Sequence, residues 1–187
     1  SGTTSGDIIG SPALSFDGRI YIGSAPFNSA GFLSFNPDGT TNWTINMPGA
    51  VRVSPAIGTN GTVYIGCDGS NFYSFSPNGA TNWVANAPSA FQSSAAIDSN
   101  GLIYVACYSG NLYAFNPTNG ATNHVWTTGK TIDRSSPVIG ANGDIYIGAY
   151  SGTTTGTLYS FNQDGSTNWS VQFTNMINST PLIGCDG

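Results

Sequence analysis

The sequence predicts an all-β chain built from repeated units of four antiparallel strands, and three observations lead to this prediction. One short stretch recurs along the 187 residues as an apolar strand, a tight turn and a second strand. Apolar and polar residues alternate with a period of two, which is typical of half-buried strands, and no helical periodicity of useful length is present. The recurring stretches open 43, 40, 42 and 44 residues apart, at Pro12, Pro55, Ala95, Pro137 and Pro181. A period of about 40 residues with strand-type units indicates stacked or radial repeats.

The turn of each stretch comes five residues after its opening. It reads Asp17-Gly18, Asn60-Gly61, Asn100-Gly101, Asn142-Gly143 and Asp186-Gly187. These dipeptides favour the positive φ that a two-residue type I′ hairpin turn requires, so we expect type I′ turns here. A tyrosine follows nine residues after each of the first four openings, at Tyr21, Tyr64, Tyr104 and Tyr146.

Taken in order, each unit is predicted to contain four short strands, the last of which carries a tryptophan. After a flexible lead-in, the first unit has strands at 7–14, 19–23, 32–35 and 41–45. The second has strands at 54–57, 63–66, 72–75 and around Trp83. The third has strands at 95–97, 102–106, 112–115 and around Trp126, after a two-residue insertion. The fourth has strands at 137–139, 144–148, 158–161 and around Trp169, and a further first strand follows at 179–183.

Four-stranded units in series, with one tryptophan each, describe the blades of a β-propeller. A blade cannot bury both of its faces alone, so we expect inter-blade packing by Trp43, Trp83, Trp126 and Trp169. The chain is then a single propeller domain over 1–187, with blades at about 11–53, 54–93, 94–135 and 136–178. Residues 179–187 start a fifth repeat.

The composition excludes several classes of function. Only 7% of residues are charged, there is no glutamate, and the net charge is −5 with four basic residues in total. Nucleic-acid binding needs clustered Lys and Arg, so no nucleic-acid partner is expected. No apolar stretch has the length of a membrane span and no signal peptide is present. A polar surface of Ser, Thr, Asn and Gly favours an exported protein that is extracellular, on the cell surface or periplasmic.

The cysteines and the histidine do not suggest a metal site. Cys67 and Cys107 stand at matching positions of neighbouring repeats, where equivalent atoms lie too far apart for most disulfides. We expect these two and Cys185 to fill strand ends, and a bridge is the alternative. His124, the one histidine, is predicted to lie solvated in a turn. We therefore expect no metal and no cofactor.

The repeat resembles that of the PQQ-like β-propellers. The resemblance rests on two runs, Ser-Pro-Ala-Ile-x-x-Asn-Gly-x-Val-Tyr-Ile-Gly and Phe-Tyr-Ser-Phe-x-Pro-Asn-Gly-x-x-x-Trp, which are found at 54–66 and 72–83 and recur at 136–148 and 158–169. It implies a propeller fold for nearly the whole chain. The family includes quinone-dependent dehydrogenases, the BamB-type assembly lipoprotein and many exported proteins of unknown role, so the resemblance does not decide the function.

The dehydrogenases of the family bind PQQ with Ca²⁺ through an Asp base, Glu and Asn ligands, and often a pair of adjacent cysteines. This chain has no glutamate and no Cys-Cys pair, and Asp7, Asp68 and Asp133 are its only acids without a turn role. Four blades are also fewer than the seven or eight usual for the family. The surplus strand at 179–183 suggests a piece of a longer propeller, or a homodimer in which two chains complete an eight-bladed ring.

A ligand is expected where the links between blades meet the channel mouth. The position three residues before each repeat opening holds Ile9, Arg52, Gln92, Arg134 and Asn178. Arg52, Gln92, Arg134 and Asn178, with Lys130 nearby, would offer donors to carboxylate, sulfate or sugar hydroxyls, and Asp133 could neutralise one arginine. The alternative is that these are solvated link residues. Two long loops at 24–31 and 149–156 lie on the same face.

We therefore predict a non-enzymatic exported module that binds or displays, with a protein or a glycan as its partner. A lectin-like sugar binder is one alternative, and it predicts exposed aromatic residues such as Phe27, Tyr108 and Tyr150 around a pocket. A fragment of a PQQ-dependent dehydrogenase is a second alternative, and it requires a buried acid and a bound cofactor.

Overall fold

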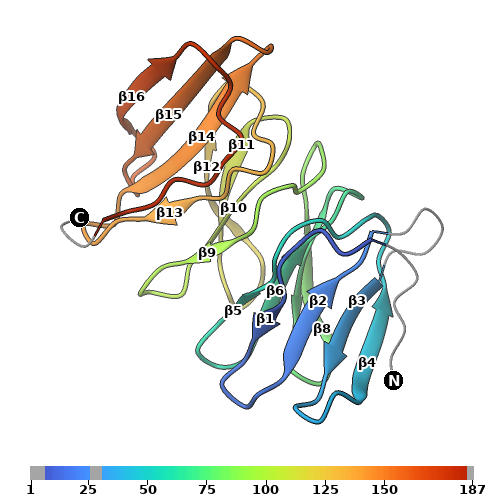
Figure 1. The fold of residues 1–187 in the computed structure, drawn as a ribbon. Coiled ribbons are helices and arrows are strands. Elements are labelled where there is room, and N and C mark those ends of the chain that lie inside the picture. Colours follow the sequence, from blue (N-terminus) through green and yellow to red (C-terminus); the bar gives the residue numbers. More distant parts are fainter. Residues whose placement is uncertain (1–6, 26–30, 185–187) are drawn as a thin grey trace. The chain divides into compact units, whose positions relative to one another are not determined.

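The computed structural model describes residues 7–25 and 31–184, and these form antiparallel sheets of four strands each (Figure 1). The first sheet contains β1 (Ala13–Leu14), β2 (Ile20–Gly23), β3 (Gly31–Phe35) and β4 (Thr41–Asn46). The second contains β5 (Ala56–Ile57), β6 (Val63–Gly66), β7 (Asn71–Phe75) and β8 (Thr81–Asn86). The third contains β9 (Ala96–Ile97), β10 (Ile103–Ala106), β11 (Asn111–Phe115) and β12 (Thr122–Thr127). The fourth contains β13 (Val138–Ile139), β14 (Ile145–Ser151), β15 (Thr155–Phe161) and β16 (Thr167–Phe173).

The predicted all-β class is confirmed, and no helix occurs in the described residues. Within each sheet the strands follow chain order, so that every neighbouring pair is a hairpin. It follows that the described part of the chain contains no helix with the length and hydropathy of a membrane span.

The turns after the first strands are built differently from the type I′ prediction, which is wrong. In the second sheet, residues 58–62 join Ile57 to Val63, and the N–H of Gly61 donates to the carbonyl of Gly58 over 2.9 Å. Gly61 has a φ of +80°, whereas Asn60 keeps a negative φ and its Oδ1 accepts from the N–H of Thr62 at 3.1 Å. The glycine alone takes the left-handed conformation, and the asparagine acts through its side chain.

The first strand of each sheet is only two residues long, which is shorter than predicted. The difference is largest in the first sheet, where a strand at 7–14 was expected. Each first strand exists only through two paired residues on the second strand, as Ala13 opposite Tyr21 and Leu14 opposite Ile20. Residues 179–183, predicted as a fifth first strand, form no strand within the described residues. They have no second strand to pair with there, which is the physical reason for the difference.

A β-bulge occurs at the same place in the fourth strand of every sheet. The bulged residue is the asparagine of a Thr-Asn pair, at Asn42, Asn82, Asn123 and Asn168. The residue after it lies opposite the next-to-last residue of the third strand, and there the third sheet has His124 where the others have tryptophan. His124 therefore lies in β12 and not in a turn, which corrects the prediction. Trp126 comes two residues later and pairs with Leu112.

The hairpin of the fourth sheet is longer than expected. Residues 149–156 were predicted as a loop, but they extend β14 and β15, with Ala149 opposite Thr157 and Ser151 opposite Thr155. The prediction of a long loop is wrong here because alternating side chains continue the ladder to a tight turn. Of the other predicted loop, 24–31, residues 26–30 lie outside the described residues.

The chain divides into two compact units, and each is described by itself. The first contains Ser1–Phe91 and Thr118–Gly120, and the second contains Gln92–Pro117 and Ala121–Gly187. In each unit two sheets pack together, and the two faces that meet are of different kinds. We call the forward face of a sheet the one that carries the tyrosine of its second strand, and the rear face the opposite one.

In the first unit, the forward face of the first sheet packs on the rear face of the second. Tyr21 and Phe32 are fully buried, with Trp43 beside them. They meet a rear face made by Val63, Ile65 and Phe75. The rings of Trp43 and Phe75 lie 6.3 Å apart between centroids.

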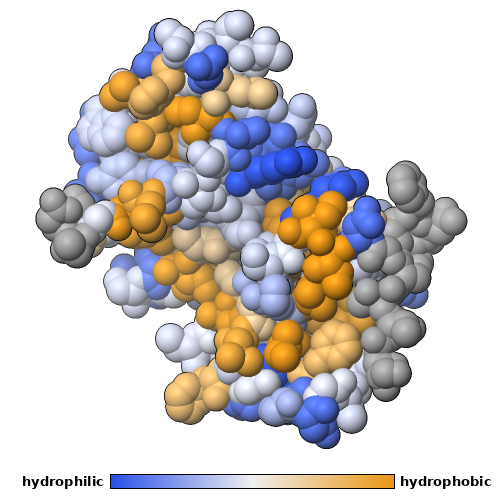
Figure 2. Space-filling view, in the orientation of Figure 1, coloured by the Kyte–Doolittle hydropathy of each residue, from blue (hydrophilic) through white to orange (hydrophobic). Residues whose placement is uncertain are grey.

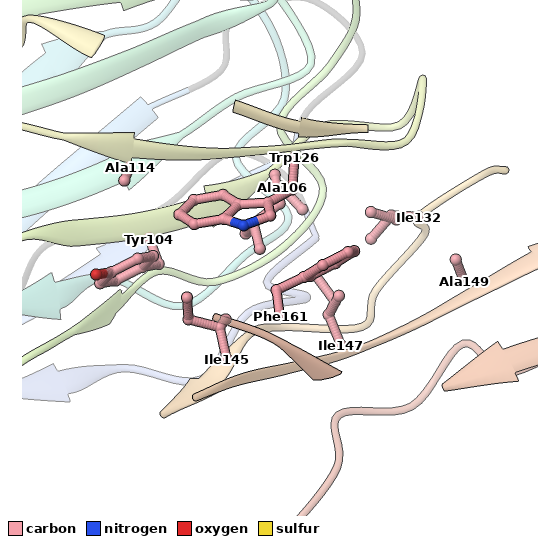
Figure 3. Packing of buried hydrophobic residues seen from close by; sticks show 10 residues of the cluster. Tyr104, Ala106, Ala114, Trp126, Ile132, Ile145, Ile147, Ala149 and Phe161 are labelled. Carbon is pink, nitrogen blue, oxygen red and sulfur yellow. The ribbon is translucent and has the colours of Figure 1, made fainter. Parts of the chain in front are cut away.

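The second unit repeats this packing between the third and fourth sheets. Tyr104, Leu112 and Trp126 of the forward face are each at most 3% exposed. Ile145, Ile147 and Phe161 form the rear face against them, and Figure 3 shows the ring of Trp126 beside that of Phe161. Each apolar core thus lies between two sheets, as expected for blades.

Candidate functional site

The links that join one sheet to the next hold the residues proposed from the sequence, and buried serines anchor two of these links. In the link before β9, the N–H of Ala106 donates to Oγ of Ser93 at 2.8 Å. In the link before β13, the N–H of Gly148 donates to Oγ of Ser135 at 2.9 Å. Both serines are at most 1% exposed. They fix the backbone directly after Gln92 and Arg134.

In the first unit, Arg52 lies in the link between β4 and β5 and pairs with Asp68. Its Nε lies 2.6 Å from Oδ2 of Asp68, and the side chains are 45% and 26% exposed. The turn that carries Asp68 is held to the link, because the N–H of Asp68 donates to the carbonyl of Ala50 at 2.9 Å. This ion pair gives Asp68 a structural role that the sequence did not indicate.

In the second unit, Arg134 lies in the link between β12 and β13 with an unusual backbone. Its φ is +62°, in the left-handed region that residues other than glycine rarely adopt. Its N–H donates to the carbonyl of Gln92 at 3.2 Å, which brings these two predicted site residues together. The side chain is 77% exposed, and its Nε lies 3.8 Å from Oδ1 of Asp133. The strained backbone therefore holds a guanidinium out to solvent beside a carboxylate.

Asp133 stands at a position that is apolar in the other repeats. The residues four before each opening are Ile8, Val51, Phe91, Asp133 and Ile177. Val51, Phe91 and Ile177 lie against Gly23, Gly66 and Gly148, where they leave no room for a Cβ. The third repeat has Ala106 in place of that glycine and a carboxylate in place of the apolar side chain. Asp133 therefore breaks the packing rule of the other links, and its side chain stays 24% exposed.

Two tyrosines lie next to this acid. The backbone of Tyr150 pairs with Thr131, N–H to O at 2.9 Å in both directions, and the carbonyl of Tyr108 accepts from the N–H of Ile132 at 3.4 Å. Burial raises the pKa of Tyr150, and the charge of Asp133 and the neighbouring hydroxyl of Tyr108 raise it further, while Arg134 lowers it. We call Tyr108, Asp133, Arg134 and Tyr150 the Asp133 site.

The remaining predicted residues have separate surroundings. Nζ of Lys130 donates to Oγ1 of Thr157 at 2.7 Å, which ties the lysine to β15. Asn178 is exposed in the segment after β16. Of the predicted aromatic residues, Tyr108 is 44% exposed and Phe27 lies outside the described residues. The structure brings together Gln92, Asp133 and Arg134, and a complete ring with Arg52 and Asn178 stays a prediction.

Sequence reasoning paired Asp133 with an arginine but did not notice how unusual the acid is. The signal was available, because aligning the repeats places Asp133 with Val51 and Phe91. Alignment of Ala80-Thr81-Asn82-Trp83 with Ala121-Thr122-Asn123-His124 would likewise have placed His124 on a strand.

The groups of the Asp133 site are suited to hydrogen bonding and ion pairing. The site offers a guanidinium and two phenols as donors and one carboxylate as an acceptor. Among residues 7–25 and 31–184, no group of three or more His, Cys, Asp or Glu could hold a metal ion. Cys67 and Cys107 are free and buried, burial raises the pKa of the Cys67 thiol, and Cys185 lies outside the described residues. The donor set of a PQQ–calcium site does not fit these residues.

Comparison with known proteins identifies the fold. The sequence model of a family described as outer membrane protein assembly factor BamB matches residues 3–182. BamB from Moraxella catarrhalis has a similar structure, with a TM-score of 0.72 at 16% identity, over 88% of this chain and 53% of that protein. A protein of unknown function from Bacteroides caccae is similar over 92% of this chain and 71% of its own, with a TM-score of 0.63 at 16% identity. No curated protein sequence matches the chain. The chain thus spans about half the length of the BamB structure.

Proposed function

Because the chain belongs to the family of PQQ-like β-propellers described as outer membrane protein assembly factor BamB, we propose that it is a non-enzymatic propeller module that binds a protein partner. The observation that carries the proposal is the Asp133 site. There a strained link displays an exposed arginine and a partly exposed acid next to two tyrosines.

The composition of this site suits a protein partner. Tyrosine and arginine are enriched at protein interfaces, because each combines a large contact area with a polar end. Arg134 is 77% exposed and its guanidinium can hold a carboxylate of the partner with two parallel hydrogen bonds. The carboxylate of Asp133 can accept a hydrogen bond from the partner, so we expect the partner surface to carry an acidic group with a hydrogen-bond donor next to it.

The proposal includes export to the periplasm or the cell surface. It rests on the polar surface of low charge and on the family, whose description names assembly of outer membrane proteins. A role in such assembly follows for this chain only if its partner belongs to that process.

Site-specific photo-crosslinking tests the proposal. A photoreactive phenylalanine replaces Tyr108 in the full chain, in the cells that produce the protein naturally, and adducts are identified by mass spectrometry. We expect one dominant protein adduct. The matched control position is Val84, an exposed residue on β8 of the first unit.

A second variant makes the result specific to the site. Arg134→Ala, combined with the crosslinker at position 108, should reduce the adduct at least tenfold, since loss of a charged hydrogen bond costs about 1.5–3 kcal/mol. The same adducts from positions 84 and 108, or an adduct indifferent to Arg134→Ala, would contradict the proposal.

Carbohydrate binding is a second candidate, favoured by the two tyrosines beside the Asp133–Arg134 pair. Aromatic faces with adjacent polar groups suit a sugar ring and its hydroxyls. Calorimetric titration with neutral and acidic oligosaccharides should then show saturable binding that Tyr108→Ala removes. Binding that persists in Tyr108→Ala would rule out a sugar at this site.

A further inference from the structure

Neighbouring sheets within a unit meet through a repeated contact on a glycine turn. Nε1 of Trp43 donates to the carbonyl of Pro77 at 3.0 Å, and the ring lies on Gly79, where a Cβ would be 3.0 Å from Cγ of the indole. In the second unit, His124 lies on Gly165 and leaves no room for a Cβ, and Nε1 of Trp126 donates to the carbonyl of Asn162 at 3.1 Å. The forward face of one sheet therefore recognises the turn between the third and fourth strands of the next.

The forward face of the fourth sheet carries the same groups with much greater exposure. Trp169 occupies the register position of Trp43 and is 41% exposed, while Val171 and Phe173 of the same strand are each 48% exposed. Tyr146 and Leu158 continue this face, and with Trp169 and Pro181 they line an apolar groove. Figure 2 shows hydrophobic residues exposed over this sheet.

The first sheet presents the complementary surface. Leu14 on its rear face is 70% exposed, whereas Ile57 and Ile139 at the same register pack against the two cores. Ile20 and Ile22 are half-buried, although their counterparts on the rear faces of the second and fourth sheets are at most 1% exposed. Hydrophobic residues are also exposed over this sheet in Figure 2.

The glycine turn of the first sheet is open as well. Gly39 corresponds to Gly79 and has a φ of +81°, and no atom of the described residues lies within 4 Å of the place where its Cβ would be. Pro37, two residues before it, corresponds to Pro77, whose carbonyl accepts from Trp43. Among the described residues, Trp169 thus lies on no glycine turn, and no indole lies on the Gly39 turn.

We propose that the forward face of the fourth sheet binds the rear face of the first sheet of a second copy of this chain. Trp169 of one copy lies on the Gly39 turn of the other, and its Nε1 donates to the carbonyl of Pro37. This inference does not depend on the proposed function, because it concerns the end sheets and not the Asp133 site.

A pair of copies satisfies both faces at once. The contact joins two different surfaces, and two such contacts related by a two-fold axis close the assembly without leaving either face uncovered. The chain aligns with 53% of the BamB structure, so two copies supply about the length of that one protein. Once the first contact has formed, the second forms within the same complex at a high effective concentration, and this raises the affinity between the two copies.

The segment after β16 also indicates that another sheet covers the forward face of the fourth sheet. The N–H of Ser136 donates to Oγ1 of Thr180 at 3.1 Å, as the N–H of Ser11 donates to Oγ of Ser54 at 2.9 Å. Residues 179–184 therefore correspond to residues 53–58, which end the link from the first sheet to the second and include β5. Leu182, which corresponds to Ala13, is 95% exposed and lies beside the groove, where a following sheet would cover it.

Light scattering on the full chain tests the proposal. We expect twice the chain mass of 19.3 kDa at micromolar concentration, and one chain mass for Val171→Asp or Leu14→Asp, because each places a charge in an apolar contact. The controls are Val84→Asp on β8 and Val125→Asp on β12. These valines lie on the rear faces of the second and third sheets, outside the proposed contact, and are 42% and 37% exposed. Both variants should leave the doubled mass unchanged. Circular dichroism checks that each variant stays folded.

Mixing the two monomeric variants identifies the faces. Val171→Asp retains an intact first sheet and Leu14→Asp retains an intact fourth sheet, so the mixture should form a dimer through one restored contact. A monomeric parent chain, which includes the case of a ring closed within one chain, overturns the proposal. So does a doubled mass that survives both variants, or a mixture that stays monomeric.

Discussion

Trp126 in the third sheet and Val171 in the fourth occupy the same register position, yet one is 3% and the other 48% exposed. Both lie on a forward face, two residues beyond the residue that follows the bulge. The difference is that the forward face of the third sheet packs on the rear face of the fourth, whereas the described residues on the forward face of the fourth, such as Phe173, are exposed. Burial in a repeat of this kind is therefore set by the neighbouring sheet and not by the residue's own strand.

Truncating this pair should give the largest effect. Trp126→Ala removes a large buried side chain and should lower the free energy of unfolding by about 3–5 kcal/mol. Val171→Ala should change it by less than about 0.5 kcal/mol in a dilute, monomeric sample, because the side chain is half in water there. Urea unfolding measures both, and equal losses would show that the fourth sheet is covered even in the monomer.

Alkaline unfolding sharpens the comparison at the covered face. Burial, together with the charge of Asp98, raises the pKa of Tyr104 to about 12, and its hydroxyl donates to Oδ2 of Asp98 at 3.2 Å. Because an unfolded tyrosine titrates near pH 10, folding favours the neutral phenol, and that stability is full below about pH 10 and is lost as the pH rises to about 12.

The free energy of unfolding should thus fall by roughly 1–3 kcal/mol over this range through Tyr104. Tyr104→Phe should show a smaller decrease between the same pH values, measured by urea unfolding at each pH. An unchanged pH profile in Tyr104→Phe would assign the loss to other groups.

Rear faces should show a smaller difference of the same kind. Ile147→Val in the fourth sheet removes one fully buried methylene and should cost about 0.5–1.5 kcal/mol. Ile22→Val at the matching position of the first sheet should cost less than half of that in the monomer, since Ile22 is only half-buried. If the two costs grow equal at concentrations where the chain dimerises, the first sheet is the surface that becomes covered.

Local chemistry explains what the sequence could predict. The period of the repeat, the place of each glycine turn and the alternation in the strands are encoded within a few residues, so the four-stranded units followed directly. The type I′ turn was wrong because the same Asn-Gly pair also serves a longer turn, in which only Gly61 has positive φ and Asn60 acts through Oδ1.

Contacts between strands limited the rest of the prediction. The register of β12 depends on a bulge at Asn123 and on the longer turn before it, so the nearest tryptophan in sequence was not the structural equivalent of Trp43. Residues 149–156 read as an insertion, but cross-strand pairs such as Tyr150 with Gly156 extend the hairpin instead. The Asp133 site combines residues from a link and two hairpins, and only the arginine and the acid were adjacent in sequence.

Substitutions in the links between sheets should give an effect of the opposite sign, and here function and stability should separate. Arg134→Gly relieves a left-handed backbone and should raise the free energy of unfolding by about 1 kcal/mol, whereas Arg134→Ala keeps the strain and should not. Ser70, with a φ of +64° in the turn between β6 and β7, is the matched control, and Ser70→Gly should give a similar gain. If the Asp133 site binds a partner, both Arg134 variants lose the crosslink from position 108 while Ser70→Gly retains it. A gain in stability without loss of the crosslink in Arg134→Gly would show that the strained arginine does not serve binding.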